Sequence, residues 1–138
     1  MKVKYLETLT PKEQIQSMFE SDIVMLSHGG GEVNILFLKP YSVVLEGNPD
    51  YFYESFGGTI AGNSRVYFIQ LNNMDEHLRV DKCSTIAHRL VNITCKIRVI
   101  QTDLHIPIDY IRSALNEAIR YLKSIDFDLY RPVYPYIL

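Results

Sequence analysis

The fold of this chain is decided by residues 21–38, which read SDIVMLSHGGGEVNILFL. Residues 23–26 form a continuous apolar run, which predicts a parallel strand buried on both faces. Three glycines follow His28, and a helical apolar stretch resumes after them. A strand, a glycine turn and a helix start bring free backbone N–H groups and a positive dipole end together, which favours an anion such as phosphate.

His28, Gly29, Gly30 and Gly31 are therefore the first candidate ligand-binding residues. Their spacing matches neither the dinucleotide fingerprint G-x-G-x-x-G nor the P-loop, in which Gly-Lys-Ser/Thr follows the spacer. Two plainer interpretations stay open. The glycines form only a flexible turn, or His28 is only a hydrogen-bonded turn residue.

Strands and helices alternate on both sides of this stretch. Thr10 to Glu13 reads as a capping box that starts a helix carrying Ile15, Met18 and Phe19 on one face. The alternation predicts an α/β fold, a Rossmann-like three-layer sandwich with a mainly parallel sheet. We expect strands at 23–27, 43–45 and 66–71, and helices at 33–38, 49–61 and 108–122. The last of these helices is amphipathic, with Asp109 near its start and Lys123 near its end, where each charge suits the helix dipole.

Composition narrows the class of protein. A chain of 138 residues is expected to form one domain, residues 1–138. Its hydrophobic content of 47% and charged content of 22% are typical of a globular protein. The net charge of −2 gives no electrostatic reason to expect nucleic acid as a partner. Cys83 and Cys95 have no metal-binding or C-x-x-C spacing, so we expect buried thiols, with one disulfide as the alternative.

Targeting and membrane association are also constrained. No run approaches the roughly 20 apolar residues of a membrane span, and residues 1–5 are too polar for a signal peptide. The compartment stays unassigned between the cytoplasm and, for a fragment of a larger enzyme, the secretory lumen.

Three further groups of polar residues are candidates for a functional site. Glu46 directly follows the third predicted strand, where a carboxylate can accept hydrogen bonds from ribose hydroxyls; the alternative is a solvated loop residue. Asn34 lies one turn into the glycine helix, where it reaches a sugar or caps the local backbone. Asp103, His105 and Asp109 precede the last helix, and helix capping is favoured there over metal binding.

The order of several residues between Gln14 and Glu46 forms a longer pattern: His28 to Gly31, Asn34, Leu36-Phe37, Pro40 and Val43-Val44-Leu45-Glu46. This pattern resembles the donor-binding half of glycosyltransferase family 61, whose motif runs His-Gly-Ala-Gly-Leu-Thr-Asn, a Leu-Phe pair, a proline and a Val-Val-Glu strand. Gly30 replaces the family's alanine, and Glu32 and Val33 replace an apolar residue and a threonine. A charged Glu32 in the first helical turn suits the helix dipole but would repel a diphosphate.

The resemblance implies the C-terminal, donor-binding lobe of a GT-B type glycosyltransferase. Such an enzyme, a hexosyl- or pentosyltransferase, moves a sugar from a nucleotide-sugar donor to a glycan or protein acceptor with inversion. The acceptor lobe is expected to be absent from this chain or to be a separate N-terminal partner, so the isolated chain is expected to be inactive. The resemblance implies these donor-binding residues: His28, Gly29, Gly30, Gly31, Asn34 and Glu46.

No cofactor and no metal are expected, and no catalytic residue is assigned. An alternative of a different class is a non-catalytic α/β module that binds a nucleotide or another phosphoryl ligand. The donor sugar, the acceptor and the oligomeric state are left open.

Overall fold

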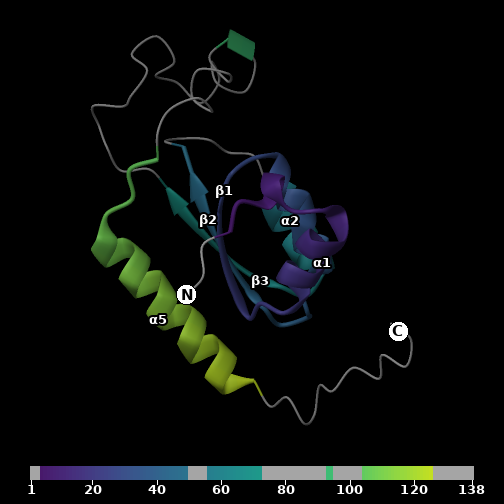
Figure 1. Cartoon of the computed structure of the whole chain (residues 1–138). Helices are drawn as coiled ribbons and strands as arrows, with labels where there is room; N and C mark the ends of the chain where they lie inside the picture. Colours follow the sequence, from purple (N-terminus) through teal and green to yellow (C-terminus); the bar gives the residue numbers. More distant parts are fainter. Residues whose placement is uncertain (1–3, 50–55, 73–92, 95–103, 126–138) are drawn as a thin grey trace.

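The computed structural model describes residues 4–49, 56–72, 93–94 and 104–125 (Figure 1). Within these ranges, one sheet is formed by three parallel strands in the order β1-β2-β3. The strands are β1 (Ile23–Ser27), β2 (Val43–Asn48) and β3 (Tyr67–Asn72). The predicted α/β class and the parallel sheet are thereby confirmed.

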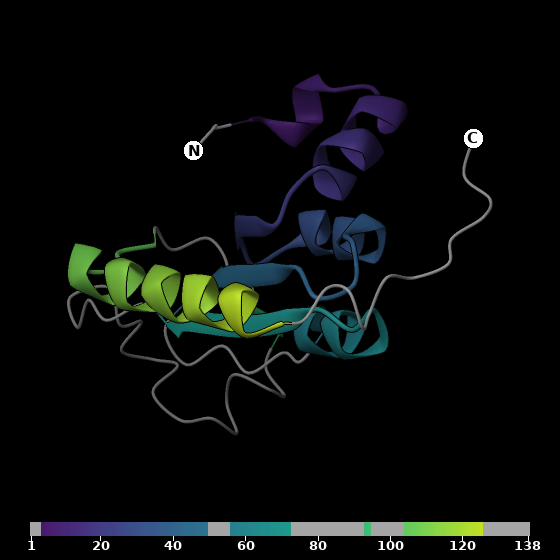
Figure 2. The same cartoon turned by 90° about the horizontal axis from the view of Figure 1, so that it is seen from below.

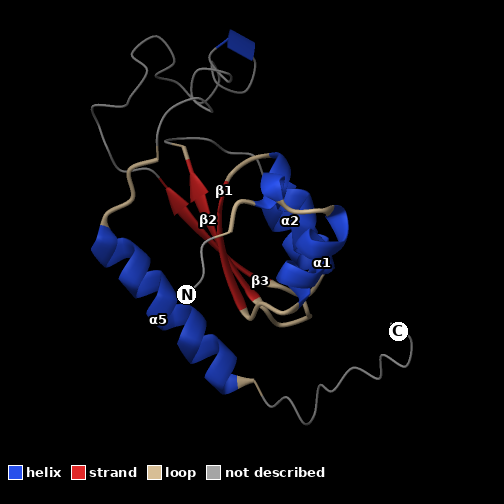
Figure 3. Ribbon diagram, viewed as in Figure 1, coloured by secondary structure: helices blue, strands red, loops and turns tan. Residues whose placement is uncertain are grey.

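Helices cover both faces of this sheet. α1 (Pro11–Phe19), the 3₁₀ helix η2 (Gly30–Phe37) and α2 (Phe56–Asn63) lie on one face, and α5 (Ile108–Ser124) lies on the other (Figures 1 and 3). A short 3₁₀ turn, η1 (Leu6–Thr8), precedes α1. The view turned by 90° in Figure 2 also shows α5 apart from α1 and α2. The described elements therefore form three layers.

Successive side chains of β2 point to opposite faces of the sheet, so the core has two halves. Val44 packs with Ile35 and Ala61 on the face covered by η2 and α2. Val43 and Leu45 pack on the opposite face against α5, where buried residues of the helix are alanines. Burial of apolar side chains on both faces makes β2 the most deeply enclosed strand, and all six of its residues are buried.

Among the described strands β1 lies at one edge of the sheet, and one of its faces is partly exposed, which corrects the prediction that it is buried on both faces. Met25 is 46% exposed. Its neighbours in alternation, Val24 and Leu26, pack into the core on the other face. On the face that holds Met25, α5 packs mainly on β2 and β3, and of β1 only Ile23 joins the cluster of apolar residues beneath it.

Several boundaries differ from those predicted. β2 continues three residues beyond Leu45, and η2 begins three residues before Val33. In α1 only Met18 of the predicted apolar face is buried, whereas Ile15 and Phe19 are 41% and 51% exposed. The helix predicted at 49–61 is described only from Phe56.

The capping and charge predictions hold where the structure describes them. Thr10 and Glu13 form the reciprocal capping box of α1. Asp109 lies in the first turn of α5 and Lys123 in its last turn. No described helix is both long and apolar enough to cross a bilayer. Asp103, Cys83 and Cys95 lie outside the described residues.

Candidate functional site

The carboxyl ends of β1 and β2 lie side by side, as the alternation of strands and helices predicted. Ser27 is aligned with Gly47 in the parallel register. The chain leaves β1 at His28, whose backbone N–H donates to the carbonyl of Gly47 at 2.8 Å. His28 is therefore held beside the end of the central strand, next to Glu46.

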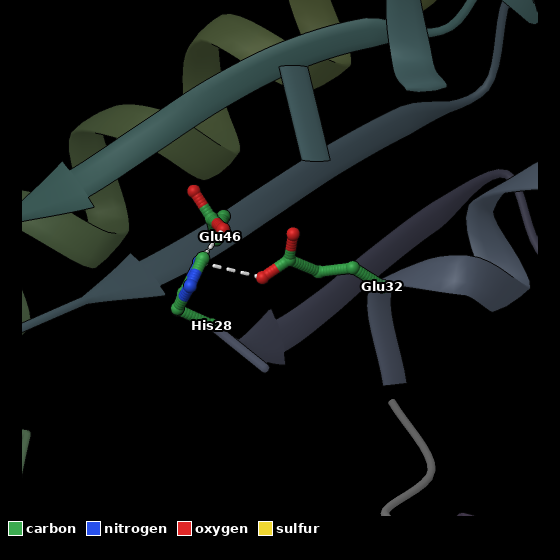
Figure 4. A group of neighbouring side chains, drawn as sticks. All are labelled: His28, Glu32 and Glu46. Carbon is green, nitrogen blue, oxygen red and sulfur yellow. Dashed lines mark hydrogen bonds and ion pairs between the residues drawn. The ribbon is translucent and has the colours of Figure 1, made fainter. Parts of the chain in front are cut away.

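Three side chains from three elements meet at this point. His28 Nδ1 lies 2.8 Å from Glu46 Oε1 and 2.6 Å from Glu32 Oε1. Figure 4 shows His28 between the two carboxylates, one from η2 and one from β2. The exposed fractions of the His28, Glu32 and Glu46 side chains are 7%, 0% and 1%. We call these three residues the His28 cluster.

In the His28 cluster one imidazole nitrogen faces two carboxylate groups. Nδ1 holds at most one hydrogen, and two carboxylate oxygens face it. Burial of Glu46, followed by the hydrogen-bonding and charge contributions of Glu32, raises the pKa of Glu46 to about 8. Gln70, on the neighbouring strand β3, donates a long hydrogen bond of 3.4 Å to the other oxygen of Glu46. Because the pKa of Glu46 lies above neutral pH, Glu46 holds a proton at pH 7.

Glu32 is turned into the protein, which corrects the expectation that its charge faces an incoming diphosphate. Its Oε1 accepts from the backbone N–H of Gly29 at 2.7 Å. Its Oε2 is buried and has no hydrogen-bond partner. Gly57 of α2 lies against this oxygen, so closely that an added Cβ at Gly57 would come within 2.7 Å of it.

The glycine turn itself is open. Gly29 has a φ of 151°, a conformation that only glycine adopts readily. Gly30 and Gly31 are exposed, and a Cβ built on either would meet no atom within 4 Å. Among the described residues, no acceptor is bonded to the backbone N–H of Gly30 or Gly31. Two backbone donors of the first turn of η2 are thus available to a ligand.

Asn34 and Glu46 are both buried in the structure. Asn34 is 8% exposed, and its Nδ2 donates to the carbonyl of Gly31 at 3.2 Å, so it caps the local backbone. Glu46 lies within β2 rather than after it, so the alternative of a solvated loop glutamate is wrong. Both residues support the turn from inside in this conformation.

The polar residues before α5 form no comparable site among those that the structure describes, His105 and Asp109. The exposed Asp109 pairs with Arg112 of its own helix, and His105 is exposed. Asp103 lies outside the described residues. Among the residues that the structure describes, the His28 cluster is the one group of three side chains with ligand atoms close enough to hold a metal ion.

Sequence reasoning missed the inward role of Glu32 and did not consider Gln70. Glu32 is only four residues after His28, so the turn that reverses the chain between them keeps the two side chains near each other. Gln70 is aligned with Glu46 in the register of β2 and β3. The first signal is visible in the sequence, whereas the second requires the strand register.

No family model, curated protein or solved structure significantly matches this chain.

Proposed function

We propose that this chain is the donor-binding lobe of an inverting glycosyltransferase of GT-B type, resembling family 61. The observation that supports this best is the open turn at Gly30 and Gly31, which presents two unbonded N–H groups beside the end of a buried parallel strand. Ligands of parallel α/β sheets bind at that end. The diphosphate of a nucleotide sugar fits two adjacent backbone donors at a helix start.

In this proposal the His28 cluster shapes the site from within. Glu32 and Glu46 hold the imidazole, and Glu32 also holds the N–H of Gly29, so the turn is fixed at both ends. A fixed turn lowers the cost of ordering donors around a diphosphate. When an acceptor hydroxyl attacks the anomeric carbon, the bond to the nucleoside diphosphate breaks. The N–H groups of Gly30 and Gly31 then stabilise the charge gained by the leaving group.

The proposal assigns acceptor binding to another lobe. A transfer reaction requires a base within hydrogen-bond reach of the acceptor hydroxyl and a surface that holds this hydroxyl in line. The described cluster meets neither need, because all three of its side chains are buried. We therefore expect little or no sugar transfer from this chain alone, to a glycan or to a protein.

Binding of the donor is tested with Gly30→Leu. The variant places a side chain over the open turn without contacting any atom at its Cβ. We expect wild-type protein to show a rise in melting temperature with a nucleoside diphosphate or nucleotide sugar. We expect Gly30→Leu to lose at least about ten-fold in affinity (1.4 kcal/mol) while its melting temperature without ligand stays similar.

Gly62→Leu is the matched control, because Gly62 of α2 is also exposed and open at its Cβ position. It should bind as the wild type does. The proposal fails if no nucleotide or nucleotide sugar binds, or if Gly30→Leu and Gly62→Leu bind equally. Equal affinity for nucleoside diphosphates with and without a sugar would favour the alternative, a phosphoryl-ligand-binding module without transferase activity.

A further inference from the structure

We propose that the His28 cluster is a binding site for a divalent cation of the Mn²⁺ or Zn²⁺ type. The ligand atoms are His28 Nδ1, Glu32 Oε1 and Glu46 Oε1, which all lie within 4.8 Å of one another. They come from the end of β1, from η2 and from β2, and Figure 4 shows the three side chains converging. The inference concerns the cluster itself and does not depend on nucleotide binding.

The first argument is charge. Two carboxylates lie buried together, and neither forms an ion pair with a lysine or arginine of the described chain. Burying uncompensated negative charge is unfavourable unless a proton or a cation neutralises it. Among the residues that the structure describes, the imidazole of His28 is the basic side chain in contact with them, and it neutralises at most one of the two charges. In the metal-free protein a proton on Glu46 removes the other charge, and a divalent ion would take the place of that proton and neutralise both carboxylates.

The second argument is an unsatisfied oxygen. Glu32 is fully buried and points into the cluster through Oε1, yet its Oε2 accepts no hydrogen bond. A buried carboxylate oxygen without a partner carries a desolvation penalty. Bidentate coordination of an ion by Glu32 would use both oxygens and remove that penalty. The unpartnered oxygen, which lies on the Gly57 side of the carboxylate, is a second observation that favours a cation here, besides the grouping of acidic side chains.

The third argument is spacing. Around an ion with bonds of about 2.1 Å, neighbouring ligand atoms lie about 3.0–3.4 Å apart. The two separations from His28 Nδ1 are 2.6 and 2.8 Å, so the ligand atoms need to move apart by less than about 1 Å. One imidazole nitrogen with carboxylate oxygens and no thiolate suits Mn²⁺, Fe²⁺ or Zn²⁺ better than Ca²⁺ or Cu(I).

The test measures Mn²⁺ binding to the full chain after removal of metal with EDTA and without any nucleotide. Mn²⁺ is the probe because it prefers oxygen and nitrogen ligands to thiolates, which limits interference from Cys83 and Cys95. Free Mn²⁺ is followed by electron paramagnetic resonance. We expect one ion per chain, with affinity at least about ten-fold weaker in Glu32→Gln and in Glu46→Gln.

Asp109→Asn is the matched control, since it removes one exposed carboxylate far from the cluster in the sequence. It should bind Mn²⁺ as the wild type does. The proposal is overturned if the wild type binds no stoichiometric ion, or if the two glutamine variants bind as Asp109→Asn does.

Pulsed electron paramagnetic resonance on the wild-type complex gives a second measurement that does not depend on the folding of the carboxylate variants. A directly bound imidazole produces a nitrogen coupling to Mn²⁺. We expect this coupling in the wild type and its loss in His28→Gln. Its absence from the wild type, or its persistence in a folded His28→Gln, overturns the assignment. Because no nucleotide is present, failure here leaves the donor-binding proposal untouched, and the converse also holds.

Discussion

Glu46 combines two properties that seldom coincide in one residue. It lies on the central strand with 1% of its surface exposed, and it carries an ionisable group 2.8 Å from an imidazole. Burial and the nearby Glu32 both disfavour its charged form, which raises its pKa to about 8 from an ordinary value of 4.5. The stability of the metal-free protein is therefore linked to pH through this residue.

The sign of that linkage follows from the two pKa values. Between about pH 4.5 and pH 8 the folded chain holds a proton on Glu46 that the unfolded chain has released. The contribution of Glu46 to the free energy of unfolding is therefore fully present below about pH 4.5. It is lost as the pH rises towards 8, with a slope of up to about 1.4 kcal/mol per pH unit. Urea unfolding in EDTA at several pH values measures this slope.

Glu46→Gln is the comparison for the pH experiment, because it keeps the size of the side chain and cannot ionise. Its unfolding free energy should change less steeply over the same range. A wild-type slope equal to that of Glu46→Gln would show that Glu46 does not take up the proton.

At the scale of the element, α1 is a helix whose N-terminal capping is well formed and whose side chains are mostly exposed. Glu13 Oε2 accepts from both the backbone N–H and the hydroxyl of Thr10, at 2.8 and 2.7 Å. Met18 is its one buried residue, so the helix gains little from packing of its other side chains. Local capping therefore contributes a large share of the stability of this element.

We expect Thr10→Ala to lower the free energy of unfolding by about 1 kcal/mol, because it removes the side chain that caps the first turn. Lys12→Ala in the same turn is the control, and it should change stability by less than about 0.5 kcal/mol, since Lys12 is exposed. Urea midpoints of the two variants decide the matter. Equal midpoints would contradict the role assigned to the capping box.

At the scale of the whole molecule, α2 and η2 approach each other closely at Gly57. Gly57 of α2 packs against Glu32 of η2 and Phe68 of β3, with no room for a side chain. Gly58, its neighbour, has only ordinary contacts with Phe68 at 3.7 Å. The two adjacent glycines therefore have different roles, although the sequence presents them as a pair.

Gly57→Ala is expected to destabilise the protein by about 1–3 kcal/mol, because the new methyl group collides with the buried carboxylate of Glu32 and with Phe68. Gly58→Ala should leave stability unchanged or raise it by up to about 1 kcal/mol through helix propensity. Thermal unfolding of both variants is the measurement. If both alanine variants stabilise the chain equally, the close contact of Gly57 with Glu32 and Phe68 is contradicted.

Local patterns in the sequence determined the parts of this protein that depend on neighbouring residues. The apolar run before His28, the capping box at Thr10 and the helical spacing after Ile108 each predicted an element that the structure contains, because hydrogen bonding and apolar periodicity act within a few residues. The glycine turn and the adjacency of β1 and β2 were also predictable, since alternating strands and helices form parallel sheets.

The burial of Glu32 and Glu46 was decided by tertiary structure alone. The sequence placed Glu46 after a strand and Glu32 at an exposed helix start, as local polarity suggests. Packing of η2 and α2 over β2 instead enclosed both carboxylates beside His28 and aligned Gln70 with Glu46. Desolvation depends on atoms brought from distant parts of the chain. A short stretch of sequence therefore does not predict which carboxylate is buried away from water.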